Sequence, residues 1–175
     1  MGFELGREQA PVTVVEFADF ACSACAQFAI ETWPQLKARY VDTGRVRWRT
    51  IPFEIGFRNS EEGARAARCA AEQGAFWRIH DVLFRRRDAW VAERNPEEAL
   101  RGLVASAGVD VARFDTCYDS GAMDEVMDDA NDAAEERGVR GTPTFFVEDV
   151  PLQGALPLEA FVQILERALA AARDP

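Results

Sequence analysis

The sequence predicts an α/β protein in which a block of helices interrupts a small sheet-containing core. Residues 12–17 form a β-branched apolar run typical of a buried strand, and a helical pattern follows directly. An alternating run at residues 45–53 completes a strand–helix–strand unit. The next strong β run comes only at residues 144–147, after a long helical stretch. No linker between these runs suggests a second independent fold.

The composition limits the classes of function. The 175 residues are close to the size of one domain, and 48% hydrophobic residues are enough for a sizeable core. The net charge of −10 argues against binding to nucleic acid or to anionic lipid, because both rely on basic patches. No apolar run approaches the length that spans a bilayer.

Two cysteines, Cys22 and Cys25, lie three residues apart where the first strand passes into helix. This spacing places both sulfur atoms on one side of the first helical turn. The N–H groups at a helix start stabilise an anion, so we expect Cys22 to have a lowered pKa and to be the attacking and leaving sulfur. Cys25 is expected to be more buried and to act as the resolving thiol. A zinc half-site or an inert structural pair are the alternatives, and the strand–helix context favours redox chemistry.

The remaining elements follow from periodicity and from capping residues. Residues 1–10 are interpreted as a loose lead-in. Pro34 should kink or divide the helix of residues 22–42. Further helices are predicted at residues 60–87 with a break near Gly74, 95–107, 110–118, 121–137 and 157–173. A short strand is predicted at residues 152–153.

Glu16 is a lone acid in the apolar run of the first strand. It is either a residue on the solvent face of an edge strand or a buried proton acceptor beneath Cys25, and the residues alone favour neither. Arg47 or Arg49 could neutralise it across neighbouring strands, although an ordinary solvated strand face is the simpler interpretation. The acids of residues 124–129 are likewise interpreted as a solvated helix face.

His80 is the single histidine of the chain, so a histidine-based triad or a multi-histidine metal site is excluded. Because it lies mid-helix between aromatic residues, we expect it to be a packing residue. Pro143 precedes a strong β run and cannot donate to a sheet ladder. The Thr142–Pro143 bond could be cis, but cis bonds are only about 5–6% of X–Pro bonds in folded proteins, so sequence physics does not establish it.

Several separate stretches together resemble the DsbA-like thiol:disulfide oxidoreductases, a thioredoxin-fold branch with an inserted helical domain. They are Ala10-Pro11-Val12, Glu16-Phe17-Ala18-Asp19, Cys22-Ser23-Ala24-Cys25, the run from Cys69 to Gly74 with Phe76-Trp77 and His80-Asp81, and the run from Gly138 to Phe146. The match covers nearly the whole chain. The cysteine motif and the Gly-Thr-Pro-Thr-Phe-Phe stretch lie more than a hundred residues apart, and their combination is far more specific than either one.

The resemblance implies a thioredoxin-like fold with an inserted all-helical subdomain. Residues 1–58 and 138–175 would form the thioredoxin-like part, and residues 59–137 the helical insertion. Thr142–Pro143 would be cis, would face the cysteine motif and would present backbone to an extended substrate. Glu16 would be the buried acid beneath Cys25.

The resemblance also implies that Cys69 and Cys117 form a structural disulfide, with two free buried cysteines as the alternative. Its 48-residue loop would be worth roughly 3–4 kcal/mol in the chain-entropy model.

The sequence departs from the best-known family pattern between its two active-site cysteines. Many members carry a histidine just before the second cysteine, where this chain has Ala24. The Ser23–Ala24 dipeptide supplies no charge, so the thiolate would depend on helix N–H groups and on the Ser23 hydroxyl or N–H. Asp19 acts in the opposite direction. We therefore expect a less strongly oxidising site than in members with that histidine.

The predicted function is disulfide formation in extracytoplasmic proteins through the Cys22–Cys25 pair. Reduced or unfolded proteins would be the substrates, a membrane quinone-linked oxidase would reoxidise the pair by family resemblance, and no metal or organic cofactor is implied. A periplasmic or extracytoplasmic location with a signal or anchor removed is expected, and a cytoplasmic one is the alternative. A reductase or isomerase using the same site, or a non-catalytic thioredoxin-like binding module, are the competing hypotheses.

Overall fold

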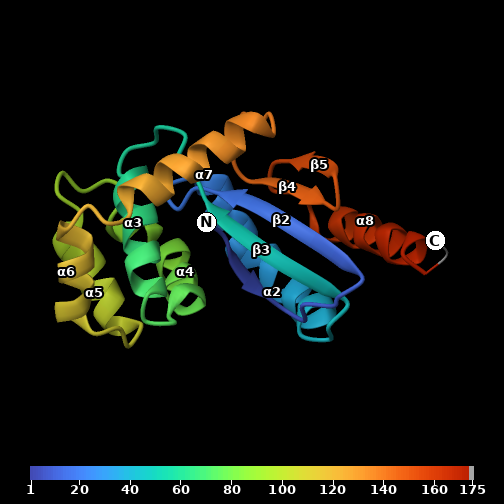
Figure 1. Cartoon of the computed structure of the whole chain (residues 1–175), viewed down its shortest axis with the longest axis horizontal. Helices are drawn as coiled ribbons and strands as arrows, with labels where there is room; N and C mark the ends of the chain where they lie inside the picture. The colour runs from blue at the N-terminus through green and yellow to red at the C-terminus, as the bar shows by residue number, and fades with distance from the viewer. Residues whose placement is uncertain (174–175) are drawn as a thin grey trace.

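The computed structural model describes residues 1–173, and within them one five-stranded sheet forms the centre of the molecule (Figure 1). The strands are β1 (Phe3–Leu5), β2 (Val12–Ala18), β3 (Val46–Pro52), β4 (Thr144–Val147) and β5 (Val150–Gln153). Their order across the sheet is β1-β3-β2-β4-β5. Strands β2 and β3 are parallel, and the other neighbouring pairs are antiparallel. The predicted strand–helix–strand unit and the thioredoxin-like fold class are confirmed.

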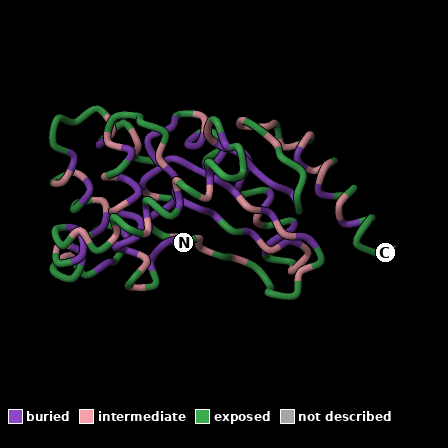
Figure 2. The backbone as a smooth tube through the Cα atoms, turned by 45° about the horizontal axis from the view of Figure 1, so that its top comes forward, coloured by how far each residue is buried: buried purple, intermediate pink, exposed green. Residues whose placement is uncertain are grey.

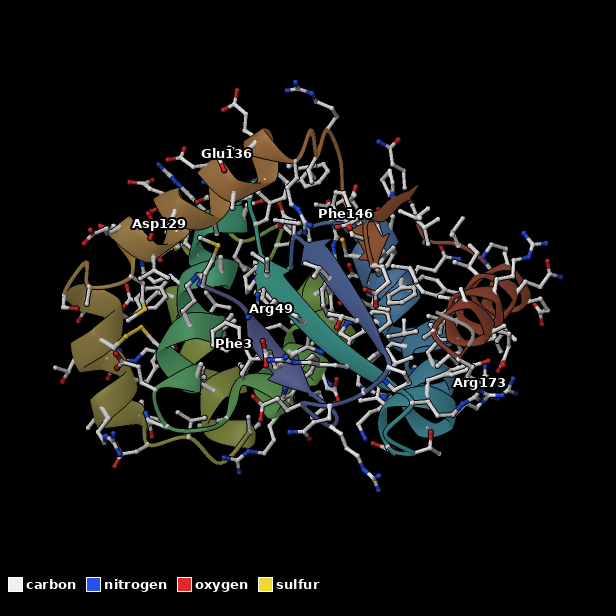
Figure 3. All side chains as sticks on the ribbon, turned by 45° about the vertical axis from the view of Figure 1, so that its right-hand side comes forward. Phe3, Arg49, Asp129, Glu136, Phe146 and Arg173 are labelled. Atoms are coloured by element: carbon white, nitrogen blue, oxygen red, sulfur yellow. A yellow bond between two sulfur atoms is a disulfide. The ribbon has the colours of Figure 1, made fainter. Side chains whose placement is uncertain are left out.

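The expectation of a loose lead-in over residues 1–10 is wrong, because β1 pairs with the outer side of β3. Phe3 stacks on the ring of Phe76 with centroids 3.8 Å apart, and Glu4 contacts Arg47 and Arg49 of β3. Figure 3 shows Phe3 and Arg49 close together at this edge of the sheet. A strand of three residues is too short to show an alternating pattern, so its formation depends on these partners.

The helical connection from β2 to β3 is divided, as Pro34 predicted. It consists of α1 (Ser23–Gln27), a π-helical segment η1 (Phe28–Thr32), α2 (Trp33–Leu36) and a second π-helical segment η2 (Lys37–Val41). Pro34 lies in the first turn of α2, directly after η1, so its missing N–H falls where the helix changes from the π-helical to the α-helical pattern. The widened turns on either side keep the connection continuous along one face of the sheet.

The helices between β3 and β4 gather at one end of the sheet (Figure 1). They are α3 (Ser60–Ala71), α4 (Phe76–Arg85), the short η3 (Arg87–Ala89), α5 (Glu97–Ser106), α6 (Val111–Asp119) and α7 (Asp124–Glu136). Gly74 separates α3 from α4 with a φ of +67°, a conformation that favours glycine. Helix α7 returns from this block to β4, and α8 (Leu158–Ala171) ends the described chain beside the β4–β5 hairpin.

Both faces of the sheet are covered, and the buried backbone runs through its centre (Figure 2). One face packs against the β2–β3 connection and α8 through a cluster that includes Phe28, Trp48 and Phe161. The other face packs against α7 through Phe17 and Ala130. The acidic side of α7 is exposed to solvent, as predicted, and Figure 3 shows Asp129 and Glu136 projecting away from the body.

A third cluster joins the active-site end of β2 and α1 to the helical block. It contains both cysteines of the predicted motif together with residues of α3 to α6. None of the helices described over residues 1–173 is both long enough and apolar enough to cross a bilayer.

Candidate active site

Cys22 and Cys25 lie at the junction between the end of β2 and the first turn of α1. Cys22 is the N-cap of α1 and has extended backbone angles, while its N–H donates to the carbonyl of Asp19 at 3.0 Å. Both cysteines are unbonded and buried, with 4% and 1% of their surfaces exposed. The strand delivers Cys22 to the edge of the sheet, and the helix start then turns its neighbouring N–H groups towards the sulfur.

The two thiols have opposite pKa shifts. The pKa of Cys22 is lowered to about 6, chiefly because the Cys25 thiol donates to its sulfur, with further help from the backbone N–H groups of Cys25 and Ala24 and against the opposing effect of burial. Burial and the neighbouring Cys22 raise the pKa of Cys25 well above its usual value. The result is one thiolate near neutral pH beside one protonated thiol.

Ser23 and Ala24 take different places in this arrangement. The Ser23 side chain makes no hydrogen bond with residues 1–173 and faces a surface hollow. Ala24 contributes its backbone N–H to the Cys22 sulfur. Because the Ser23–Ala24 dipeptide carries no charge, stabilisation of the thiolate comes from N–H groups and from Cys25.

The chain segment before β4 faces Cys22 from the opposite end of the sequence. The Thr142–Pro143 peptide bond is cis, and the thiol of Cys22 donates to the carbonyl of Thr142 at 3.3 Å. The carbonyl of Pro143 accepts from the N–H of Gly154 at 2.8 Å. The structure thus brings together the two motifs that lie more than a hundred residues apart in the sequence.

Glu16 is buried on β2, so the interpretation as a solvent-facing residue is wrong. Its Oε2 accepts from the indole N–H of Trp48 at 2.9 Å and from the hydroxyl of Thr50 at 2.8 Å. Both donors belong to β3, and no hydrogen bond joins Glu16 to Cys25 within residues 1–173. Burial raises the pKa of the Glu16 carboxyl, against the lowering effect of nearby His80 and of the two donors.

Neither Arg47 nor Arg49 neutralises Glu16. Glu16 pairs in register with Thr50, so alternation along β3 places the two arginines on the opposite face of the sheet. There both guanidinium groups contact the carboxylate of Glu4 in β1. The interpretation of Arg47 and Arg49 as residues of an ordinary strand face is therefore correct, although that face also contacts β1, which the sequence analysis did not predict.

Asp19 and Arg87 hold the loop that leads into Cys22, and the sequence pointed to neither as an anchor. The buried Asp19 carboxylate accepts from the N–H of Ala21 at 2.8 Å and from the hydroxyl of Ser60 at 2.6 Å. Arg87 Nε donates to the carbonyl of Ala21 at 2.8 Å. Because Ser60 and Arg87 both belong to the helical block, that block fixes the Ala21 peptide from two sides.

His80 and the second cysteine pair lie in the core of the helical block. His80 packs among Phe20 and Phe84, and its Nδ1 lies 3.0 Å from Asp81 Oδ1. It is a packing residue, as expected. A disulfide joins Cys69 of α3 to Cys117 of α6, and closes a sequence separation of 48 residues.

Comparison with known proteins places the chain in a family. Residues 1–167 match the profile of a thioredoxin family. The chain is 32% identical over 147 residues to probable disulfide bond formation protein D of Bacillus anthracis, covering 82% of this chain and 68% of that protein. Its fold is similar to the crystal structure of Wolbachia pipientis alpha-DsbA1, with a TM-score of 0.87, 23% identity and coverage of 98% and 92% of the two chains.

A second group of relatives is much longer. The chain is 37% identical over 171 residues to Na(+)/H(+) antiporter NhaA 3 of Salinispora tropica, which covers 96% of this chain but only 25% of that protein. The chain thus spans about a quarter of the length of the antiporters that it matches.

The cysteine pair at a helix start, the facing cis-proline and the sheet order together define a redox-site protein of the thioredoxin family, and the chain belongs to that family. Within that family, the chain is related to a protein named for disulfide bond formation, and its fold is that of a DsbA-type structure.

Proposed function

We propose that this protein exchanges disulfides with protein substrates through Cys22 and Cys25, and that its net direction is disulfide formation. The observation that carries the proposal is the asymmetry of the pair. Cys22 has a pKa of about 6 and contacts the Thr142 carbonyl, whereas Cys25 is buried and holds its proton. A thiol of low pKa is a good leaving group in thiol–disulfide exchange.

The reaction starts from the Cys22–Cys25 disulfide. A substrate thiolate attacks Cys22, which breaks the bond to Cys25 and forms a mixed disulfide, and the released Cys25 sulfur takes up a proton. A second substrate thiolate then attacks the substrate sulfur of the mixed disulfide and expels Cys22 as a thiolate. The substrate loses two electrons, and the pair gains them. An external oxidant must remove these electrons before the next cycle.

The supporting residues take roles that follow from their positions. Thr142 and Pro143 offer backbone beside Cys22 to an extended substrate segment, in the manner of strand addition. Glu16 is assigned the role of a buried acid near the site, since burial raises the pKa of its carboxyl on β2. We assign residues 59–137 to a helical insertion that holds the active-site loop, and residues 1–58 and 138–175 to the thioredoxin-like part, of which 174–175 lie outside the described residues.

Substrates and location follow from the same chemistry. The substrates are proteins with free thiols, and an extracytoplasmic compartment is the place where a newly formed disulfide persists. The Cys69–Cys117 disulfide supports this location. A membrane oxidase that reoxidises the pair is the partner that the reaction requires.

The equilibrium redox potential of the Cys22–Cys25 pair, titrated against glutathione, tests the direction. We expect a value on the oxidising side of thioredoxin, between roughly −120 and −230 mV. A Cys69→Ala, Cys117→Ala variant measured in parallel isolates the active pair. A potential near roughly −270 mV would overturn disulfide formation and favour a reductase. A Cys22 that fails to react with alkylating agents would favour a non-catalytic binding module.

A further inference from the structure

A hollow lies directly beside the nucleophile, between α1 and the end of α4. Ser23, Ala26 and Ile30 of the β2–β3 connection line it, and so do four residues at and just after the end of α4: Phe84, Arg85, Arg87 and the carboxylate-bearing Asp88. Its volume is about 210 Å³, which is below the size range typical of cofactor sites and suits a single side chain. Because Ser23 follows Cys22 directly, residues next to a cysteine bonded to Cys22 are within reach of this hollow.

The rim of the hollow carries positive charge that the protein leaves uncompensated. Arg85 is exposed and makes no salt bridge with any residue of the described chain, 1–173. Arg87 Nη1 lies 3.2 Å from Asp88 Oδ1, so this pair largely cancels. Glu31 lies beside Ile30 in sequence, and its carboxylate accepts from Gln27. What distinguishes Arg85 from the other arginines without a salt bridge is its place on the rim of a hollow that Ser23, the neighbour of Cys22, also lines.

Arg85 also borders a second hollow on its other side. This hollow has a volume of about 520 Å³, and its lining includes Val82, Arg86 and Leu103 from α4 to α5. Arg85 thus stands between two partly apolar hollows, and we call the two together the Arg85 groove. Ser23 lines the first of these hollows, residues of α5 line the second, and Arg85 lines both.

We propose that the Arg85 groove binds the substrate segment that flanks the reactive cysteine, and that it selects a segment with an apolar side chain followed by an acidic one. This proposal rests on the proposed function and names the substrate class for the same site. The exposed side chain of Ile30, beside the nearly buried Ala26 and Phe84, receives the apolar side chain, and Arg85 pairs with the carboxylate. A free anion would gain nothing from these apolar side chains, which is why a peptide is the occupant that fits.

The other side of the nucleophile strengthens the same preference. A hollow of about 260 Å³ is lined by Arg140 together with Thr142 and Pro143. Arg140 is exposed and, like Arg85, has no salt bridge with residues 1–173. A substrate lying across Cys22 therefore meets an unpaired arginine in each of these two hollows. Attraction between such arginines and an acidic segment raises the rate of encounter and is screened by salt.

The test measures oxidation of three dithiol peptides by the protein in its Cys22–Cys25 disulfide form. The peptides carry Leu after the first cysteine and then Glu, Gln or Lys, and are otherwise identical. Second-order rate constants come from acid quenching and chromatography. Each is divided by the rate of the same peptide with hydroxyethyl disulfide, an uncharged oxidant, so that differences in peptide thiol pKa cancel. At low ionic strength we expect the Glu peptide to react about fivefold faster than the Lys peptide, and added salt to reduce this ratio.

Charge-reversal variants locate the effect. Arg85→Glu should abolish or invert the Glu-to-Lys preference. Arg167→Glu makes the same change in net charge on α8, beside a different hollow, and should retain the preference. Equal rates for the three peptides with wild-type protein, or equal loss in both variants, would overturn the proposal. Failure to oxidise even dithiothreitol would instead overturn the proposed function, so the two failures are distinguishable.

Discussion

At the scale of single residues, Cys22 obtains its reactivity from hydrogen bonds and not from a neighbouring cation. Its sulfur accepts hydrogen bonds from the Cys25 thiol and from the N–H groups of Ala24 and Cys25, while the Ala24 side chain carries no charge. These donors stabilise the thiolate in the folded, reduced protein only. Because the unfolded chain lacks them, the low pKa of Cys22 is also a contribution to the stability of the reduced form.

Alkylation of the reduced protein by iodoacetamide should follow the thiolate fraction of Cys22, with a midpoint at pH about 6. Cys25 should stay silent in this range, since burial raises its pKa. Ala24→His should move the midpoint lower, because an imidazolium beside the sulfur favours the thiolate. A midpoint above pH 8 in the wild-type protein would contradict the hydrogen-bonded site, and Cys22→Ser serves as the unreactive control.

The same shift sets a pH window for stability. The folded pKa of Cys22 lies below the unfolded value, so its contribution is complete above about pH 9 and is lost as the pH falls through 6. Urea unfolding of reduced wild-type protein and of Cys22→Ser checks this directly. The difference between their free energies of unfolding should grow from pH 5.5 to pH 8.5.

Glu16→Gln should stabilise the protein at neutral pH. Burial raises the pKa of the Glu16 carboxyl, so the charged form costs about 1.4 kcal/mol for each pKa unit of elevation. This cost is absent below about pH 4.5, grows as the pH rises to the folded pKa and is constant above it. The glutamine oxygen can still accept from Trp48 and Thr50. A variant that is less stable than wild type at every pH would show that the carboxylate has a favourable partner.

At the scale of elements, the contact between α3 and the segment carrying Trp90 leaves no space for a side chain at Gly63. A Cβ built there would lie 2.6 Å from the Trp90 ring and 3.2 Å from the Cβ of Phe20. Trp90 is fully buried, and its indole N–H donates to the carbonyl of Leu83 at 3.2 Å, so it has little freedom to move. Packing therefore opposes the better helix propensity of alanine at this position.

Gly63→Ala and Gly102→Ala should change stability in opposite directions. At Gly63 the overpacking cost of roughly 1–3 kcal/mol exceeds the propensity gain of about 1 kcal/mol. A Cβ added at Gly102 in α5 would meet no atom within 4 Å, so alanine there should add roughly 0.5–1 kcal/mol. Urea unfolding of both variants gives the sign of each change in the free energy of unfolding. If both substitutions stabilise the protein, Trp90 can shift to accommodate the added methyl group at residue 63.

At the scale of the whole molecule, the active site and the helical block share one buried cluster. Cys22 and Cys25 pack in the same cluster as Ala66 and Phe114. The loop before Cys22 is also tied to the block by Ser60 and Arg87. This shared cluster couples unfolding of the helical block to unfolding of the active site, because neither part can expose its side of the cluster without disrupting the other.

Equilibrium unfolding should therefore be a single transition. Far-UV circular dichroism and tryptophan fluorescence should give the same urea midpoint, since tryptophans lie both in the sheet core, at Trp48, and in the helical block, at Trp90. Amides of α5 and of β2 should exchange with similar free energies in the most protected class. An earlier transition confined to α3–α6 would show that the insertion unfolds independently.

The strands and helices of the core, the cysteine pair and the proline segment could be predicted from the sequence alone, because each is encoded by a contiguous stretch of residues, and the order of these stretches indicated the fold class. A β-branched run, a helical period and a Cys-x-x-Cys motif are local signals that neighbouring residues define. The division of the helix at Pro34 and the break at Gly74 are local in the same sense, since each follows from the backbone chemistry of one residue.

Which distant groups meet was settled only in the folded chain. Strand β1 forms because Phe3 stacks on Phe76 and Glu4 pairs with Arg47 and Arg49. A strand of three residues is too short to show a periodic pattern that would predict it. The burial of Glu16 depends on the register of β2 with β3. Hydrogen bonds from Ser60 to Asp19 and from Arg87 to Ala21 tie the loop before Cys22 to helices far along the chain. Hydrogen bonds and packing between distant segments depend on the three-dimensional fold, so no periodic pattern in the sequence predicts them.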